Sequence, residues 1–277
     1  MNTLIIKILK ALPRAIKDPK RAIELFRRRV FPFGLTPKDS EAYRIASWSY
    51  GDLPRVNFKS ISKDPKVNTL TLLNVFDRTD DLSIDILELT YLISLIKIYK
   101  AQNILEIGTW DGNTTLNIAA NLDEQGKIVT VDLPPDSKGY FSLETPDMLK
   151  NLTDRHQLGI QYKKTKFESK IKQVYGDSAA IDWKTLGGPF DLIFIDGCHA
   201  FNYVKSDTEN ALSVLREGGT MVWHDYGMIK DVGLYLDQLA KKLNIVVLRG
   251  TRIALATSLS KKEIQESLKY SQNSIKE

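Results

Sequence analysis

Short apolar runs alternate with amphipathic stretches through the middle of the chain. Five runs have the length and composition of buried strands: residues 103–107, 127–131, 171–175, 190–195 and 219–223. Helical spacing is found before, between and after these runs, at residues 82–99, 113–122, 203–216 and 231–243. In the first of these helices the pattern predicts one apolar face made of Ile86, Leu89, Ile93 and Ile96.

Two further apolar runs, residues 244–248 and 252–256, stand too close together for a helix between them. They predict a terminal hairpin, which places one antiparallel strand in the sheet. Strands that alternate with helices predict a mostly parallel, doubly wound sheet. We therefore expect an α/β, Rossmann-like fold with seven strands, followed by a short polar helix and tail over residues 259–277.

The N-terminal region has a different pattern. Residues 1–31 carry a net charge of +7, which leaves −2 for the rest of a chain of net charge +5. Leu4, Ile5, Ile8 and Leu9 recur at helical spacing and predict a basic amphipathic helix. Such a helix either contacts a membrane surface or a partner, or packs on its own domain or on a second subunit.

Three segments follow from these patterns. Residues 1–80 are expected to form the basic helix and a cap or linker, in a mainly helical extension. Residues 81–258 are expected to form the α/β domain, and residues 259–277 the C-terminal helix and tail.

Composition narrows the class of protein. Hydrophobic residues make up 43% of the chain and charged residues 26%, as in an ordinary globular protein. The single cysteine, Cys198, excludes an internal disulfide and suits a reducing compartment. We expect a cytoplasmic protein, with possible peripheral contact at the inner face of the membrane through the basic arm. The α/β domain lacks the excess of basic residues that nucleic-acid binding requires, so no nucleic-acid partner is expected.

Acidic and imidazole groups stand where two of the expected strands end. Asp196 and His199 follow the run 190–195, and His224 and Asp225 follow the run 219–223. Open α/β sheets bind ligands at the carboxyl ends of their strands. If the two strands are neighbours, the four side chains converge on one site.

A glycine-rich turn follows the first strand. The motif is Glu106-x-Gly108-Thr109-x-x-Gly112, in which Gly108 allows a sharp turn and the helix after Gly112 offers free N–H groups to an anion. Asp132 ends the second strand, where a carboxylate can accept ribose hydroxyls. NAD-binding folds use similar features, although their middle glycine is replaced here by Trp110.

Further motifs along the chain favour a different cofactor. Val131-Asp132-Leu133-Pro134-Pro135, Val174-Tyr175-Gly176-Asp177-Ser178, Ile195-Asp196-Gly197-Cys198-His199 and His224-Asp225-Tyr226 occur in that order. Over residues 82–257 the series resembles class I S-adenosylmethionine-dependent methyltransferases. In particular, it is similar to the bacterial family related to macrocin-type sugar O-methyltransferases and cephalosporin-hydroxylase-like proteins.

The resemblance implies a set of residues that bind S-adenosylmethionine, with Asp177 and Ser178 on the adenine side. The expected cofactor-binding residues are Glu106, Gly108, Thr109, Gly112, Asp132, Asp177, Ser178 and Asp196.

The resemblance also implies a divalent metal, Mg²⁺ or Mn²⁺, and a base. Asp196 and Asp225 match metal-ligand positions, and His199 matches the proposed base; we expect His199 and Asp196 to be catalytic. His224 departs from the family, which has a carboxylate there. Imidazole suits zinc, manganese or iron better than magnesium. Either His224 joins Asp196 and Asp225 around a different metal, or the site holds no metal.

The resulting expectation is an enzyme that methylates a hydroxyl of a sugar, glycoside or related small molecule, and that forms a homo-oligomer. A metal-independent methyltransferase with another acceptor is one alternative. An NAD-dependent oxidoreductase is a second. A non-catalytic protein that keeps the cofactor fold and uses its basic arm to reach a membrane or partner is a third.

Overall fold

The structure is a computed structural model, and it describes residues 50–62, 67–75, 84–135, 137, 141–145 and 158–273. The expected basic helix lies outside the described residues and stays a prediction. Eight strands form one sheet: β1 (Arg55–Val56), β2 (Asn103–Ile107), β3 (Lys127–Asp132), β4 (Ile171–Tyr175), β5 (Phe190–Ile195), β6 (Leu215–Trp223), β7 (Val246–Leu248) and β8 (Ala254–Leu259).

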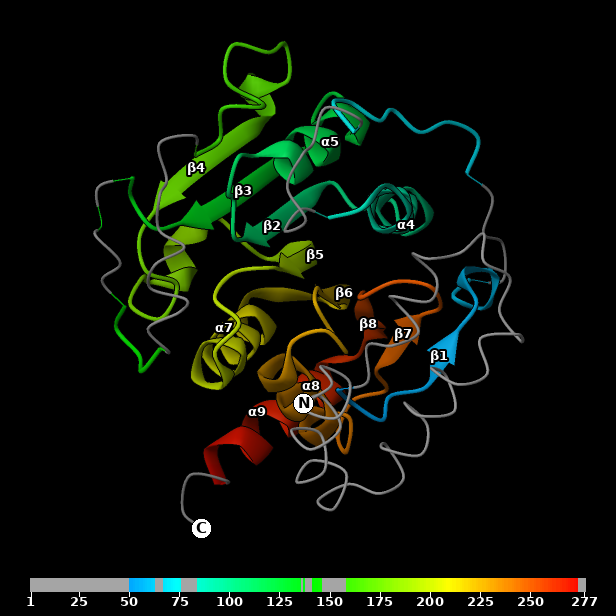
Figure 1. The fold of residues 1–277 in the computed structure, drawn as a ribbon, viewed down its shortest axis with the longest axis vertical. Coiled ribbons are helices and arrows are strands. Elements are labelled where there is room, and N and C mark those ends of the chain that lie inside the picture. Colours follow the sequence, from blue (N-terminus) through cyan, green and yellow to red (C-terminus); the bar gives the residue numbers. More distant parts are fainter. Residues whose placement is uncertain are drawn as a thin grey trace, which may run out of the picture. The chain divides into compact units, whose positions relative to one another are not determined.

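The strand order is β1-β7-β8-β6-β5-β2-β3-β4 (Figure 1). The pairs from β6 to β4 are parallel, whereas β8 runs antiparallel to both β6 and β7. This confirms the Rossmann-like fold with its terminal hairpin. The eighth strand is β1, which pairs in parallel with β7 although its residues were expected in a cap or linker.

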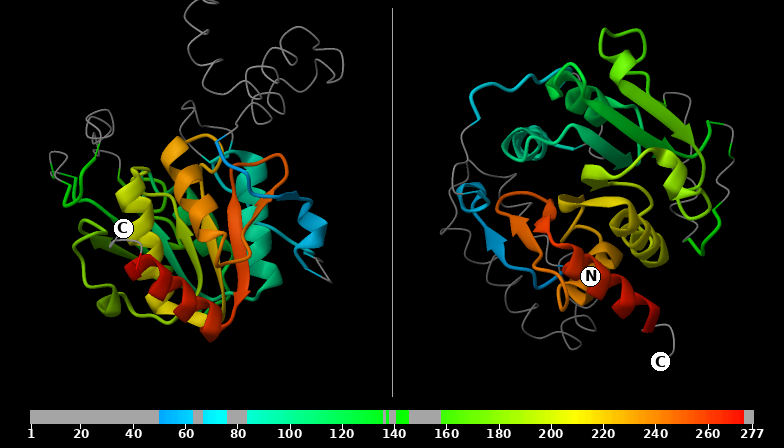
Figure 2. Two further views of the ribbon diagram at one scale, coloured as in Figure 1. Left: turned by 90° about the horizontal axis from the view of Figure 1, so that it is seen from below. Right: turned by 180° about the vertical axis from the view of Figure 1, so that it is seen from behind.

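Helices cover both faces of the sheet (Figure 2). One face carries α4 (Ile86–Ile98) and α5 (Asn113–Asn121), and the other carries α7 (Phe201–Val214), α8 (Lys230–Leu239) and α9 (Lys261–Asn273). Short 3-10 helices occur at η2 (Phe58–Ser60), η3 (Glu168–Lys170) and η4 (Trp183–Leu186). In the part of the chain that the structure describes, no helix is both long and apolar enough to cross a membrane.

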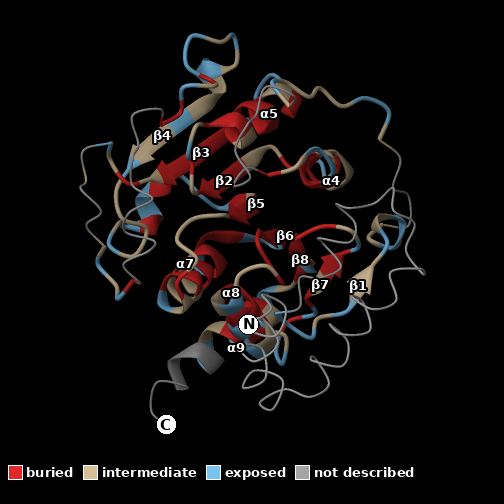
Figure 3. Ribbon diagram, in the orientation of Figure 1, coloured by how far each residue is buried: buried red, intermediate tan, exposed pale blue. Residues whose placement is uncertain are grey.

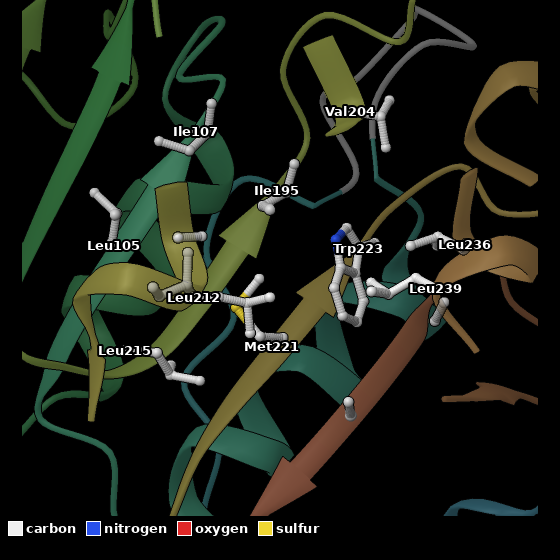
Figure 4. Packing of buried hydrophobic residues seen from close by; sticks show 14 of the residues in the cluster. Leu105, Ile107, Ile195, Val204, Leu212, Leu215, Met221, Trp223, Leu236 and Leu239 are labelled. Atoms are coloured by element: carbon white, nitrogen blue, oxygen red, sulfur yellow. The ribbon is translucent and has the colours of Figure 1, made fainter. Parts of the chain in front are cut away.

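Alternation along the central strands divides the core into two layers (Figure 3). Leu105 and Ile107 of β2 face α7 and α8, whereas Ile104 faces α4 and α5. Met221 and Trp223 of β6 lie in the same layer as Leu105 and Ile107, as Figure 4 shows. Both layers are apolar because a central parallel sheet is buried on its two faces.

Helix α4 buries Leu89, Ile93 and Ile96 as predicted, but Ile86 is 45% exposed. Glu88 is fully buried on the face that also contains Leu92. The helix begins with a capping box, in which the Asp85 carboxylate accepts from the Glu88 N–H and the Glu88 carboxylate accepts from the Asp85 N–H. A single acidic side chain therefore lies on an otherwise apolar helix face.

Three asparagines on α5 hold an extended segment, residues 71–74, against the helix. The amide of Asn121 accepts from the N–H of Thr71 and donates to its carbonyl, at 2.9 and 2.7 Å. Asn117 does the same for Leu73, at 2.7 and 3.0 Å, and Asn113 donates to the Leu73 carbonyl at 3.4 Å. We call Asn113, Asn117 and Asn121 the asparagine ladder.

Candidate active site

A cavity of about 340 Å³ opens at the carboxyl ends of β2, β3, β5 and β6. Most of the side chains that the sequence singled out line it: Gly108, Thr109, Asp132, Asp177, Ser178, Asp196, His199 and Asp225. Glu106, Gly112 and His224 are not among the lining residues. Strands β5 and β6 are neighbours, with Ile195 opposite Trp223, so the two acid–imidazole strand ends do meet.

The turn after β2 fits tightly against the end of β5. At Gly108, where φ is +98°, a Cβ atom would lie 2.1 Å from the carbonyl oxygen of Asp196. Trp110 has φ of +48°, in the left-handed region that costs a non-glycine residue energy. This conformation explains why glycine would suit position 110, and it places an indole that is 39% exposed at the cavity.

Asp132 holds this turn in place. Its Oδ2 accepts from the N–H groups of Thr109 and Trp110, each at 2.9 Å, and its Oδ1 accepts from Leu133 N–H at 2.7 Å. Asp132 thus fixes the turn through three backbone N–H groups, and it also lines the cavity.

Glu106 and Gly112 support the turn from outside the cavity. Glu106 accepts from the hydroxyls of Thr115 and Thr130, the latter at 2.7 Å. Burial raises the pKa of Glu106 to about 8, although the two hydroxyls oppose the rise. Gly112, at φ +84°, precedes α5 and leaves no room for a Cβ against Tyr162.

The side of the cavity next to β4 is shaped by Asp177. Its Oδ2 accepts from the Tyr203 hydroxyl at 2.7 Å and from Ser142 N–H at 2.6 Å, and its Oδ1 accepts from Ala179 N–H. The ring of Phe141 meets that of Tyr203 edge to face, at 5.7 Å between centroids. These contacts join the short described piece 141–145 to the cavity wall.

Asp196, His199 and Asp225 bring three ligand atoms within 4.8 Å of one another. Nε2 of His199 lies 3.0 Å from Oδ2 of Asp225 and 3.5 Å from Oδ1 of Asp196, without the alignment of a hydrogen bond. Asp225 has φ of +58°, so its backbone turns sharply to aim the carboxylate. Two carboxylates with one imidazole form a donor set that suits a divalent cation.

His224 is not part of this group of three, and its role as a metal ligand stays a prediction. Its Nε2 lies 2.9 Å from Oε2 of Glu88, and its Nδ1 lies 3.1 Å from Oδ1 of Asp196 and 3.4 Å from Oδ1 of Asp225. The side chain is 1% exposed and does not line the cavity. Both ring nitrogens thus face carboxylates.

Two residues of this group were missed from the sequence, Glu88 and Arg252. The Arg252 guanidinium contacts Glu88 at 2.6 Å and Oδ1 of Asp225 at 2.9 Å. A lone acid on an apolar helix face was the signal for Glu88, because a buried charge needs a partner. Arg252 comes just before β8, and no pattern in the residues around it indicated a role in the site.

Charges in this group shift the pKa of each member. Burial alone would raise the pKa of Glu88, but His224 and Arg252 bring it below the ordinary value. Burial would lower the pKa of His199, but Asp196 and Asp225 raise it to about 9. The neighbouring carboxylates overcome the effect of burial on His224 and hold its pKa well above the ordinary value. The neighbouring imidazoles and Arg252 overcome the effect of burial on Asp225 and hold its pKa below the ordinary value.

Comparison with known proteins finds a matching domain model and a distant relative. Residues 105–226 match the family model described as a methyltransferase domain. The chain is 26% identical over 152 residues to the tapetum-specific methyltransferase 1 of Arabidopsis thaliana, a match that covers 53% of this chain and 57% of that protein. It thus spans little more than half the length of this relative.

Solved structures agree with the fold. The O-methyltransferase TomG of Streptomyces achromogenes, in complex with S-adenosylmethionine, superposes with a TM-score of 0.50 at 17% identity, over 86% of this chain and 96% of that one. A Klebsiella pneumoniae protein provisionally assigned as an O-methyltransferase gives 0.50 at 16% identity, over 86% and 97%. The chain therefore shares the fold of these methyltransferase structures, and its residues 105–226 match the model of a methyltransferase domain.

Proposed function

We propose that this protein is an S-adenosylmethionine-dependent O-methyltransferase that acts on a small molecule. The observation that carries the proposal is one continuous cavity. It runs from the turn at Gly108 and the Asp132 carboxylate to the group Asp196, His199 and Asp225. A cofactor site and a group able to handle an acceptor hydroxyl thus share one space.

The cofactor side fits S-adenosylmethionine. Asp132 would accept the ribose hydroxyls, and Asp177 and Ser178 would line the adenine side. Gly108 lines the cavity, and the absence of a Cβ there lets the turn pack directly against the Asp196 carbonyl. When bound, the cofactor supplies a methyl group on a positively charged sulfur, ready for displacement by an oxygen.

On the acceptor side, the chain must orient a hydroxyl and receive its proton. We propose His199 as the proton acceptor, because its ring lines the cavity beside two carboxylates. Those carboxylates raise the pKa of His199 to about 9, so the ring gives up its own proton readily only when their charge is offset.

A divalent cation on Asp196 and Asp225 would provide that offset and lower the pKa of the acceptor hydroxyl. Because His199 is assigned as the proton acceptor and His224 does not line the cavity, the ligands that we propose are the two carboxylates, which suit Mg²⁺ as well as Mn²⁺.

The acceptor that we propose is a carbohydrate or glycoside, as the sequence resemblance implies. Trp110 supports this choice, since a partly exposed indole at the cavity offers a flat face on which a sugar ring can stack. Homo-oligomer formation and contact of the basic arm with a membrane stay predictions.

Calorimetry on the full chain tests the cofactor. S-adenosylhomocysteine should bind, and NAD should bind more weakly or not at all. Asp132→Ala should weaken S-adenosylhomocysteine binding by at least about tenfold, because each hydrogen bond to a charged group contributes about 1.5–3 kcal/mol. Asp191→Ala is the matched control, since Asp191 also accepts from two backbone N–H groups, Gln102 and Asn103, but does not line the cavity.

Mass spectrometry tests the acceptor class. The protein with S-adenosylmethionine and Mg²⁺ should transfer methyl groups to members of a panel of glycosides. Transfer only to non-sugar hydroxyls would reject the carbohydrate and keep the enzyme class. No binding of either cofactor form would reject the proposed function as a whole.

A further inference from the structure

Glu88 is a fully buried carboxylate that contacts two cationic side chains at once. Its Oε2 lies 2.9 Å from Nε2 of His224 and 2.6 Å from Nη2 of Arg252. Its Oε1 accepts from Nε and from the backbone N–H of Arg252, at 3.0 and 2.7 Å. Both carboxylate oxygens are therefore used, and neither faces the cavity.

Both partners of Glu88 contact the aspartates of the candidate site. His224 Nδ1 lies 3.1 Å from Oδ1 of Asp196 and 3.4 Å from Oδ1 of Asp225, and Arg252 Nη1 donates to Oδ1 of Asp225 at 2.9 Å. The second oxygen of Asp225, Oδ2, is the one that faces His199 at 3.0 Å. Each aspartate is thus held by one oxygen from beneath.

We propose that Glu88 is a positioning residue for this site, acting through His224 and Arg252 on Asp196 and Asp225. The inference deepens the proposed function, because the two aspartates are the ligands proposed there for a divalent cation. It concerns a residue of α4, a helix that contributes no side chain to the acid–imidazole group itself.

The arrangement of the side chains around Glu88 explains why this carboxylate is needed. A buried cation needs an anionic partner, and removal of one member leaves the others uncompensated. With Glu88 present, the Arg252 guanidinium is shared between Glu88 and Asp225, and the His224 ring lies between Glu88 and Asp196. Without Glu88, Arg252 would have only Asp225 to pair with and would compete with any cation that binds there, and the His224 ring would lose the contact that orients Nδ1 toward Asp196.

The first test measures the NMR signals of the histidine rings in the absence of a metal. The chain has three histidines, so long-range ¹H–¹⁵N spectra contain three sets of ring signals, which His156→Gln and His199→Gln assign. In Glu88→Gln, the His199 signals should move. Glu88 and His199 are linked in the described structure through the cations and aspartates named above, so a shift at His199 reports that the aspartates have moved.

Asp85→Ala is the matched control. It removes the N-terminal cap of the same helix, a loss of about 1 kcal/mol, while the Glu88 side chain and its two cationic partners stay. The His199 signals should keep their positions in this variant, although its thermal unfolding temperature falls.

The second test measures Mn²⁺ affinity by calorimetry on the full chain. Glu88→Gln should bind Mn²⁺ about 10- to 100-fold more weakly than the parent, the usual cost of losing a residue that orients metal ligands. Asp85→Ala should bind Mn²⁺ as the parent does. S-adenosylhomocysteine binding that persists in both would show that the cofactor side is folded.

If Glu88→Gln does not fold, Arg252→Lys takes its place, since a lysine cannot contact Glu88 and Asp225 together through a fork. His199 signals that match those of Asp85→Ala would overturn the proposal. A parent that binds no Mn²⁺ would reject the metal in the proposed function, and the spectra alone would then decide the role of Glu88.

Discussion

The backbone N–H of Trp110 donates a hydrogen bond to Oδ2 of Asp132 at 2.9 Å, and this bond holds Trp110 in a left-handed conformation. The same oxygen accepts from Thr109. The carboxylate that we assign to the cofactor ribose thus also fixes the turn in front of it. The bond leaves the Trp110 indole at the cavity, where it reports on the site.

The fluorescence of Trp110 should respond to a ligand in the cavity. Of the three tryptophans that the structure describes, Trp183 and Trp223 are only 4% and 1% exposed, whereas Trp110 lines the cavity. The fourth, Trp48, lies outside the described residues, so Trp48→Phe serves as the control. S-adenosylhomocysteine should change the emission of the parent, and Trp110→Phe should lose most of that change while calorimetry still detects binding. A response that persists in Trp110→Phe would place the bound ligand elsewhere.

Gly108→Ala should abolish S-adenosylhomocysteine binding. The new Cβ would lie 2.1 Å from the Asp196 carbonyl oxygen, so the turn or the end of β5 must move. The strained conformation alone costs about 1–3 kcal/mol. Gly218→Ala is the matched control, because Gly218 also has a positive φ, +76°, but a Cβ there meets nothing within 4 Å. The Gly218→Ala variant should lose stability and keep its affinity for S-adenosylhomocysteine.

Glu106→Gln should change how stability depends on pH. The folded protein holds the Glu106 proton up to a pKa of about 8, above the ordinary 4.5. Such a group stabilises the fold at low pH, and the contribution is lost as pH rises toward 8. The loss is roughly 1.4 kcal/mol for each pH unit within that window.

The variant lacks this titration, so its stability relative to the parent should rise from pH 5 to about 8 and then level off. Urea unfolding of both proteins at several pH values measures the difference. A constant difference across that range would mean that Glu106 is ionised in the folded protein.

Mn²⁺ should stabilise the parent against thermal unfolding. A ligand at 100 times its dissociation constant adds about 2.7 kcal/mol to the free energy of unfolding. Asp225→Asn should lose this gain, because the amide removes a charged ligand while asparagine still tolerates the left-handed backbone. Asp237→Asn should keep it, since Asp237 bonds Tyr226 and Asp52 instead. If Mn²⁺ raised the thermal unfolding temperature of both variants equally, Asp225 would not be a metal ligand.

The central fold was predictable because its strands are continuous apolar runs, which a buried parallel sheet requires. Strand β1 was not, because two residues paired through their backbone leave no periodic pattern. The burial predicted for Ile86 of α4 was also wrong, because several apolar residues surround the helix and no polar face marks the exposed side.

The site was predictable as a location but not as a set of contacts. Asp196 and Asp225 meet because parallel strands end at one edge. The position of His224 beneath them depends on Glu88, which is 136 positions away in sequence, and such pairing cannot be read from strand order. The sequence therefore named His224 correctly as unusual, but not the direction in which its ring points.

The asparagine ladder binds peptide backbone. Its amides contact the N–H and carbonyl groups of Thr71 and Leu73, in the manner of a neighbouring strand. Side-chain identity at these two positions is therefore open to change, while proline, which has no N–H, is excluded from both. Helix α5 thus fixes the path of this segment through its backbone, independently of the side chains at residues 71 and 73.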